Sequence, residues 1–226
     1  MTTDVILIAG TIVEHEVVSG MTSTWKRIPR LTEIGAIGEQ SDPKEKTTLE
    51  DSIKKYDSGL RDAPDKNLKG QYIPTKLTGE KHYDDYVLQQ EFITRCRNEE
   101  EFNTRVVWPD GDVSAWLHKS LGFEFDQGTQ EDWKMFTTNG KQNSRVVYGV
   151  SVTGTPTVTV AATTQLTVAT IPMNLDTSAG VIYWKSSDEA VATVDTNGLV
   201  TGVVAGTTDI TAEFRGVIGT LEVTVS

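Results

Sequence analysis

The sequence predicts a mainly β protein of two domains, the first of which contains one helix. Short β-branched runs, separated by Gly, Asn and Pro turn residues, recur along much of the chain. Only one segment repeats its apolar residues with the period of a helix. The composition changes sharply near residue 154: residues 1–153 carry 19 Lys and Arg and 25 Asp and Glu, whereas residues 154–226 carry 2 and 7. A length of 226 residues accommodates one or two domains.

The overall composition excludes several classes of protein. A net charge of −11 argues against a protein that grips nucleic-acid phosphates, because such a protein needs a surplus of Lys and Arg. No apolar stretch approaches the roughly 20 residues that span a bilayer. The run Val5–Val13 lacks the basic segment and the cleavage site of a signal peptide. The single cysteine excludes an internal disulfide and fits a reducing cytoplasm. Because the chain has neither a long apolar stretch nor a signal-peptide pattern, we expect no membrane insertion.

The first domain opens on a strand and continues into a long polar stretch. Residues 4–18 are rich in Val and Ile, with a polar interruption at Glu14–Glu16. Residues 39–66 combine mixed charges with few apolar side chains and show no strand pattern. A loop of this length inside a compact domain is usually functional or disordered. Residues 67–77 are expected to return the chain as a strand.

The segment 83–102 is the predicted helix. Its apolar stripe consists of Leu88, Phe92, Ile93 and Cys96. Asp84 and Asp85 fall in the first turn, where a helix favours acids, whereas Glu99–Glu101 opposes the dipole at the other end and predicts that the helix ends there. We interpret Cys96 as a buried small hydrophobe rather than a reactive thiol.

A hairpin is predicted directly after the helix. Residues 103–108 and 113–118 are its strands, and Pro109–Asp112 carries turn residues. The second of these strands is expected to continue through residues 123–125, and further strands are expected around residues 133–136 and 145–152, with a turn at Thr138–Gly140. The expected fold of residues 1–153 is a β-sandwich or partial barrel with one α-helix.

The joint between the domains lies at Gly154-Thr-Pro156, a short linker with little helical tendency. We predict one domain over residues 1–153 and a second over residues 154–226. The alternative is one large sandwich whose composition drifts along the chain.

The second domain contains seven short alternating segments in about 70 residues, the pattern of an antiparallel β-sandwich. Trp184 alternates with Ile182, so both should point between the sheets. Asn197-Gly198 suits a tight turn that needs positive φ. The expected strands are residues 157–160, 166–168, 181–184, 191–194, 199–201, 208–212 and 221–225.

This stretch resembles the bacterial immunoglobulin-like group 2 module nearly from end to end. The matching elements, in order, are Trp184-Lys-Ser-Ser-Asp188, Val191-Ala-Thr-Val-Asp195, Asn197-Gly-Leu-Val-Thr-Gly202, Ala205-Gly-Thr-Thr-Asp-Ile-Thr-Ala212 and the final Val223-Thr-Val225. Modules of this family decorate adhesins and the outer surfaces of phage virions. The resemblance therefore implies a decoration domain that makes weak contact with a host surface.

Residues 5–152 resemble the major tail tube protein of long-tailed, siphovirus-type, lambda-like bacteriophages. The resemblance rests on the order of elements and on two motifs, the turn Trp108-Pro-Asp-Gly111 after the helix and the segment Thr48–Asp62, which is similar to that family's T…K…G-L-x-D loop. It implies the tail-tube fold, a structural virion protein in the viral tail, and self-assembly in the host cytoplasm.

We find no pattern that predicts chemistry. His15, His82 and His118 lie far apart, and none has a second ligand at a metal-binding spacing. The acid pairs Asp84–Asp85 and Asp110/Asp112 belong to a helix start and a turn. We therefore expect no catalytic, cofactor-binding or metal-binding residues, no cofactor and no enzyme activity.

Two hypotheses about function follow. In the first, the chain is the major subunit of a phage tail tube, and it forms stacked hexameric rings whose lumen conducts genomic DNA during ejection without binding it specifically. Its partners are further copies of itself and the tape measure, tail terminator and tail tip proteins. A net-acidic wall repels phosphates; alternatively, the acids lie outside and the bore is neutral. In the second hypothesis, the chain is an immunoglobulin-like surface adhesin or a carbohydrate-binding protein.

Overall fold

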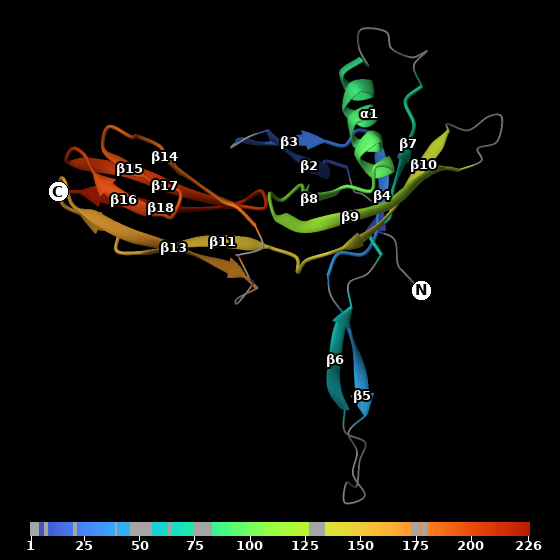
Figure 1. Cartoon of the computed structure of the whole chain (residues 1–226), viewed down its shortest axis with the longest axis horizontal. Helices are drawn as coiled ribbons and strands as arrows, with labels where there is room; N and C mark the ends of the chain where they lie inside the picture. Colours follow the sequence, from blue (N-terminus) through green and yellow to red (C-terminus); the bar gives the residue numbers. More distant parts are fainter. Residues whose placement is uncertain are drawn as a thin grey trace, which may run out of the picture. The chain divides into compact units, whose positions relative to one another are not determined.

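The computed structural model describes residues 5–6, 9–19, 22–38, 40–45, 56–62, 65–74, 83–126, 134–172, 177 and 180–226. The predicted fold class is confirmed, because the protein is mainly β (Figure 1). One sheet is accompanied by the single helix of the described residues, and immunoglobulin-like sheets follow at the C-terminal end. The chain divides into two compact units.

The first sheet has eight strands in the order β1-β4-β7-β10-β9-β8-β2-β3. Its strands are β1 (Val5–Ile6), β2 (Ile12–Ser19), β3 (Thr22–Arg27), β4 (Leu31–Ile34), β7 (Leu68–Gln71), β8 (Glu101–Val107), β9 (Val113–Phe125) and β10 (Met135–Gln142). The opening apolar run is not one strand, because a turn at Ala9–Gly10 separates β1 from β2 and Gly10 has a φ of 93°. The sheet is open, with β1 at one edge and β3 at the other.

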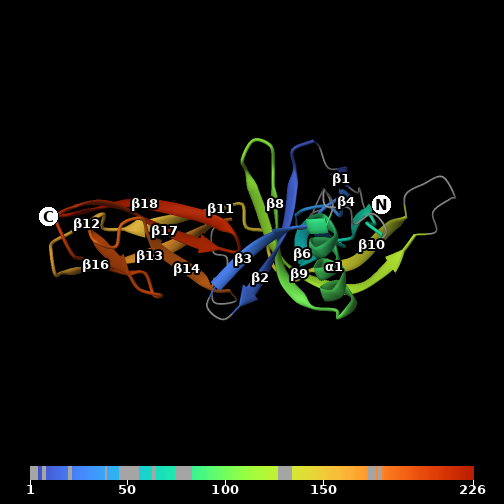
Figure 2. The same ribbon diagram turned by 90° about the horizontal axis from the view of Figure 1, so that it is seen from above.

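Helix α1 (Tyr83–Arg97) lies against this sheet (Figure 2). It buries Phe92, Ile93 and Cys96, as the apolar pattern predicts, and also Gln89. The Gln89 amide is fully used: Oε1 accepts from the backbone N of Ile73 at 2.7 Å, and Nε2 donates to the carbonyls of Gln71 at 2.9 Å and Pro29 at 3.3 Å. A glutamine therefore takes a core position because it satisfies backbone groups at the ends of neighbouring strands.

The helix ends in a Schellman motif centred on Glu99. The backbone N of Glu100 donates to the carbonyl of Arg95, and that of Glu99 donates to the carbonyl of Cys96, both at 3.1 Å. Glu99 has a φ of 54°, in the left-handed region where glycine is usual. The predicted end of the helix near Glu99–Glu101 is thus correct, and its cause is this left-handed residue.

Replacing Glu99 with glycine is expected to stabilise the first unit by about 0.5–1 kcal/mol, because glycine adopts a positive φ without a clash. Glu99→Ala is the matched control: it removes the same exposed carboxylate but keeps a Cβ. Chemical denaturation of both variants measures the difference. Equal free energies of unfolding for the two variants would show that the backbone conformation costs nothing.

The polar stretch 39–66 contains two strands that its sequence pattern did not predict. Strand β5 (Gln40–Glu45) pairs antiparallel with β6 (Tyr56–Asp62) in a two-stranded sheet of their own. The pairing shifts register between Ser41 and Pro43, where proline lacks the N–H that a regular ladder uses. The residues between the strands lie outside the described ranges.

The expected turn at Thr138–Gly140 is wrong, because these residues lie within strand β10. The register with β9 shifts between Asn139 and Gly140, which identifies a bulge. A Cβ added at Gly140 would lie 2.3 Å from Cε1 of His118, so only glycine fits this close approach. Asn139-Gly140, a dipeptide typical of tight turns, therefore forms a β-bulge here.

The C-terminal strands form two four-stranded sheets, in the orders β11-β13-β16-β15 and β12-β18-β17-β14. Their bounds are β11 (Gly149–Gly154), β12 (Thr157–Val158), β13 (Thr163–Ile171), β14 (Ile182–Ser186), β15 (Ala192–Val194), β16 (Leu199–Gly202), β17 (Gly206–Phe214) and β18 (Val217–Val225). All pairings within the sheets are antiparallel except that of β12 with β18, which is parallel. All seven segments predicted as strands contribute to this sandwich.

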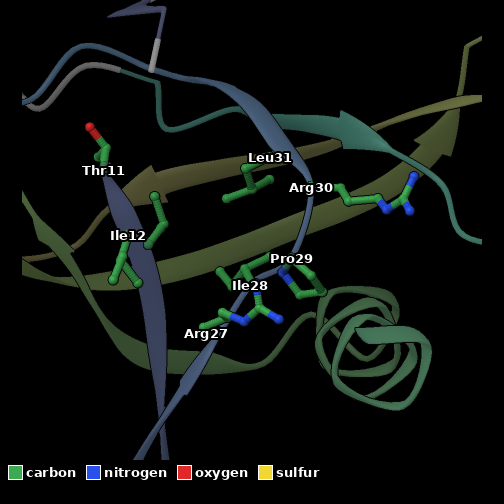
Figure 3. A pocket seen from close by; sticks show the side chains of 8 residues that line it. Thr11, Ile12, Arg27, Ile28, Pro29, Arg30 and Leu31 are labelled. Carbon is green, nitrogen blue, oxygen red and sulfur yellow. The ribbon is translucent and has the colours of Figure 1, made fainter. Parts of the chain in front are cut away.

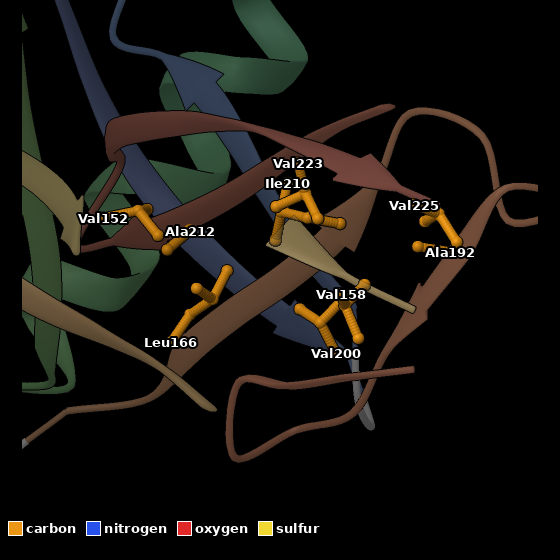
Figure 4. Packing of buried hydrophobic residues seen from close by; sticks show 9 residues of the cluster. All are labelled: Val152, Val158, Leu166, Ala192, Val200, Ile210, Ala212, Val223 and Val225. Carbon is orange, nitrogen blue, oxygen red and sulfur yellow. The ribbon is translucent and has the colours of Figure 1, made fainter. Parts of the chain in front are cut away.

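The core of the sandwich is aliphatic (Figure 4). Ile182 and Trp184 pack against it from β14, as their alternation predicts. The buried residues are Val152, Val158, Leu166, Ala192, Val200, Ile210, Ala212, Val223 and Val225. Because these side chains come from both sheets, the core holds the two layers together.

The second unit also includes part of the first sheet. It comprises Thr104–Ala115, the tip of the β8–β9 hairpin, together with Val147–Ser226. Ala115 and Val147 exchange two backbone hydrogen bonds, of 2.9 and 2.7 Å, and both residues pack with Phe214 and Val217 in a buried cluster. Arg105 Nη1 donates to the carbonyl of Gly216 at 2.7 Å. The domain boundary between residues 153 and 154 stays a prediction.

Candidate assembly surface

The edge strand β3 offers backbone groups for pairing. The backbone N of Ile28 donates to the carbonyl of Val13, and hydrogen-bonded pairs alternate along an antiparallel ladder. The backbone groups of Thr22, Thr24 and Lys26 therefore face β2, whereas those of Ser23 and Arg27 point away from it. A strand edge of this kind is a template for pairing with another chain.

Helix α1 holds this edge strand through two ion pairs. Lys26 Nζ lies 2.7 Å from Glu91 Oε2, and Arg27 pairs with Asp85 in the first turn of the helix. All four side chains are partly exposed, so each pair contributes at most about 1 kcal/mol. The pairs fix the position of β3 rather than supply much stability. Asp85 thus has a partner that its place at a helix start did not reveal.

Behind the edge strand lies a buried polar network around Glu16. The Glu16 carboxylate accepts hydrogen bonds from Ser23 Oγ and from Asn103 Nδ2. Arg95 Nη1 on the helix donates to the Glu16 carbonyl at 2.6 Å and contacts His15 Nδ1 at 3.0 Å. The network joins β2, β3, β8 and α1. Glu14 and Glu16 alternate along the strand, and charged residues in such a pattern usually face solvent. The sequence therefore gave no sign of a buried network around Glu16.

The two described histidines are buried and neutral. His15 and His118 are both fully buried, and Phe102 lies between their rings, with centroids 5.8 and 5.2 Å away. Burial lowers the pKa of His15 to about 3, with help from Arg95 and Lys26. Burial lowers the pKa of His118 to about 3 as well, with help from Lys66. His82 lies outside the described residues.

Cys96 is completely buried, as predicted. Burial raises the pKa of its thiol to about 12, so the thiol stays protonated at neutral pH. Since the thiolate is the reactive form, this residue behaves as a small hydrophobe.

Lys66 is a buried residue that the sequence did not single out. Its Nζ donates to the carbonyl of Ala36 and lies 5.1 Å from the centroid of the Trp116 ring. Burial lowers the pKa of Lys66 to about 7. It sits in the polar stretch 39–66, where lysine is normally exposed, so no local signal distinguishes it.

A small cavity of about 130 Å³ lies in the first unit where β3 ends, lined by the start of β2 and by the residues that lead into β4 (Figure 3). In the figure, Ile12, Ile28 and Leu31 face a common space, while the Arg30 side chain extends away from them. The lining residues are Thr11, Ile12, Val13, Arg27, Ile28, Pro29, Arg30 and Leu31. No pair of groups suited to acid–base or nucleophilic chemistry lines this space.

The remaining acid pair and the aromatic turn are structural. Asp110 Oδ1 accepts from the backbone N of Asp112, and Trp108 N donates to the carbonyl of Asp112 at 2.8 Å. Gly111 has a φ of 93°, as a tight turn requires. Within the described ranges, no three His, Cys, Asp or Glu side chains converge to hold a metal ion. Among the same residues, no helix is long and apolar enough to cross a membrane.

Comparison with known proteins places a family match in the second half of the chain. Residues 146–225 match the family model of the bacterial Ig-like domain (group 2). Two curated relatives from Bifidobacterium longum subsp. longum are a 3-O-alpha-D-galactosyl-alpha-L-arabinofuranosidase, 41% identical over 81 residues, and an alpha-L-arabinofuranosidase, 35% identical over 134 residues. These alignments cover 34% and 54% of this chain but only 7% and 12% of the relatives.

Two solved structures are similar in backbone. A chain of the tail of an empty gene transfer agent particle, computed with helical refinement and C6 symmetry, has a TM-score of 0.45 and 10% identity, over 61% of this chain and 93% of that one. A chain of the virion of a native gene transfer agent particle has a TM-score of 0.40 and 12% identity, over 60% and 92%.

Proposed function

We propose that this protein is a structural, non-enzymatic subunit of a phage-like tail tube, which polymerises through the edges of its eight-stranded sheet. The observation that carries the proposal is the open sheet ending in β3, braced by helix α1 through Lys26–Glu91 and Arg27–Asp85. Pairing of sheet edges between copies closes a barrel and leaves no edge exposed. The resemblance of residues 5–152 to major tail tube proteins supports the same assignment.

In this proposal the subunits form hexameric rings that stack into a tube in the virion, with the tape measure, tail terminator and tail tip proteins as partners. The β5–β6 ribbon is a two-stranded sheet separate from the eight-stranded one, and we assign it to contacts between rings. Residues 1–153 carry a net charge of −6, so genomic DNA passes a wall that repels its phosphates over about one Debye length, ~8–10 Å.

A proline at the β3 edge is expected to block assembly. The backbone N–H of Ser23 points away from β2, so Ser23→Pro removes a donor from the edge while keeping the β2–β3 ladder. Ser23→Ala is the matched control, because both variants lose the hydroxyl that donates to Glu16. Electron microscopy of the purified chains should show tubes for the natural protein and for Ser23→Ala, and only unassembled subunits for Ser23→Pro. Tubes of normal length from a folded Ser23→Pro variant would refute pairing through this edge.

We further propose that residues 154–226 form a decoration domain that assembly does not require. The eight-stranded sheet uses no strand after β10. A chain cut after Thr153 is therefore expected to form tubes, visible by electron microscopy. A cut chain that is folded by circular dichroism but makes no tubes would contradict this.

A second candidate function is suggested by the curated relatives, because this chain matches parts of two enzymes whose names describe action on glycans. In this alternative the protein is an immunoglobulin-like surface adhesin or a carbohydrate-binding protein. Such a protein should remain monomeric and bind glycans, whereas a tube subunit should self-associate. Weak host-surface contact by the module is compatible with both.

A further inference from the structure

The chain contains two Asn-Gly dipeptides in very different surroundings. Asn139-Gly140 lies at the bulge of strand β10, and Asn197-Gly198 lies in the exposed turn between β15 and β16. Glycine following asparagine leaves its backbone nitrogen unshielded, so that nitrogen can reach the asparagine side-chain carbonyl carbon. The same attack of a glycine nitrogen on an asparagine side chain can therefore be compared in two backbone settings.

The turn at Asn197 is held by backbone donors around Asp195. Asp195 Oδ1 accepts from the backbone N of Asn197 and of Leu199, both at 2.8 Å. The backbone N of Gly198 donates to the Asp195 carbonyl at 3.1 Å, and Gly198 has a φ of 81°. The Asn197 side chain is exposed at the tip of this turn, and the residue that follows it is a glycine with positive φ.

A side-chain hydrogen-bond donor contacts the peptide group between Asn197 and Gly198, whose nitrogen would be the nucleophile. Gln165 Nε2 donates to the carbonyl oxygen of Asn197 at 2.8 Å. When the Gly198 nitrogen loses its proton, negative charge spreads onto this oxygen, and a donor already in place stabilises that charge. Gln165 therefore makes the Gly198 amide more acidic. The 3.1 Å bond from this amide to Asp195 opposes the reaction, so the modification is slow rather than immediate.

We propose that Asn197 is a site of spontaneous deamidation in the folded protein and that Gln165 promotes it. The Gly198 nitrogen, after losing its proton to water, attacks Cγ of Asn197. The C–N bond of the side-chain amide breaks, and ammonia leaves with a proton from solvent. Water then opens the resulting succinimide at either carbonyl. The net reaction converts asparagine and one water into aspartate or isoaspartate and one ammonia.

The strand setting protects Asn139. Asn139 pairs with Gly122 of β9, and the carbonyl of Gly140 accepts from the backbone N of Lys66 at 2.8 Å. Gly140 is also packed directly against the His118 ring. The pairing with β9 and the packing of Gly140 hold this backbone in place, so we expect the fold to hinder ring closure there.

Deamidation would alter a turn that sits on the sandwich core. A Cβ at Gly198 would lie 2.6 Å from Cζ2 of Trp184, so the backbone of this turn has no spare room. Isoaspartate adds a methylene to that backbone and a second carboxylate beside Asp195. The modified turn should hold Trp184 less firmly against the core.

Tryptic mapping separates the two sites cleanly. Cleavage after Lys185 and Arg215 releases residues 186–215, and cleavage after Lys134 and Lys141 releases residues 135–141; each peptide has one asparagine and no glutamine. On prolonged incubation of the folded chain, mass spectrometry should show the 186–215 peptide gaining one mass unit while the 135–141 peptide does not. In the denatured chain both should gain it. An unchanged 186–215 peptide, or equal rates at both sites in the folded chain, overturns the proposal.

The role of Gln165 is tested by Gln165→Ala against Thr163→Ala, an exposed residue on the same face of β13. Gln165→Ala removes two hydrogen bonds of Nε2, one to the carbonyl of Leu166 and one to that of Asn197, and the loss of the second should slow deamidation at Asn197 about two- to tenfold. The melting temperature serves as the structural readout and should be the same for both variants. If the two variants deamidate at the same rate, Gln165 has no part in the reaction.

Discussion

Phe214→Ala is expected to reduce the free energy of unfolding of the second unit by about 3–5 kcal/mol. Phe214 is fully buried and packs with Ala115, Val147 and Val217 in a cluster that includes the tip of the β8–β9 hairpin. Removing the phenyl ring leaves a cavity that cannot collapse fully, because the backbone holds the surrounding side chains in place. Because a domain of this kind is stable by only about 5–15 kcal/mol, the loss is a large share of the total.

The matched control is Ile218→Ala, a residue of the neighbouring strand whose side chain is 58% exposed. Hydrogen exchange during denaturant unfolding resolves the two units separately. Phe214→Ala should lower protection throughout the second unit, in residues 147–226 and also in residues 104–115, while the first unit keeps its protection. Normal protection at residues 104–115 in this variant would contradict a core shared between the hairpin tip and the sandwich.

The first unit is expected to lose stability steeply on acidification from about pH 6.5 to about pH 3, because His15 and His118 stay neutral when folded. Each has a pKa of about 3 in the folded protein, against the 6.5 that is ordinary for a solvated histidine. The unfolded chain therefore binds protons in this range that the folded chain does not. The contribution of the histidines to stability is complete above pH 6.5, and below it falls by up to about 1.4 kcal/mol per pH unit for each histidine.

The test is the double variant His15→Asn and His118→Leu, studied by urea denaturation across this range. Asparagine keeps an acceptor for Arg95, and leucine fills the site of a ring whose nitrogens have no hydrogen-bond partner among the described residues. We expect the variant to show a much flatter pH dependence between pH 6.5 and pH 4.5, above the range where most carboxylates titrate. An unchanged slope would mean that the two rings are protonated in the folded state.

Lys66 adds a separate pH dependence to the stability of the first unit, above neutral pH. Its pKa is about 7 when folded, against 10.5 for a lysine in water, so the folded chain releases a proton that the unfolded chain retains. Stability from this source rises as the pH increases from about 7 to about 10.5 and is lowest below that window. The histidine variant should keep this rise, which separates the two effects.

The elements that the sequence predicted well are those whose signal is local. The seven sandwich strands, the helix and the hairpin at Pro109–Asp112 each combine a hydrophobic period with turn residues at their ends. The end of the helix could also be placed from a local signal, because the acidic side chains of Glu99–Glu101 are unfavourable at the C-terminal end of the helix dipole. Alternation alone also placed Ile182 and Trp184 against the core.

The elements that the sequence missed depend on tertiary contacts. Asn139-Gly140 has the sequence of a turn, but β9 and the His118 ring hold it in a strand. Strands β5 and β6 pair with each other without an apolar pattern. Gln89, Glu16 and Lys66 are polar residues whose burial is compensated by partners distant in sequence. No local pattern records such partners, so the polar part of the proposed assembly surface could not be derived from the sequence alone.

The parallel pairing of β12 with β18 gives the sandwich a mechanical property. Thr224 N donates to the carbonyl of Pro156, Ser226 N to that of Val158, and Val160 N to that of Ser226, at 2.9–3.0 Å. A force that pulls the two ends of the module apart acts along these two strands and strains all three bonds at once. Peeling a hairpin, by contrast, would break its bonds one after another. The three bonds therefore share such a load in shear, and the module should resist extension better than one that unzips.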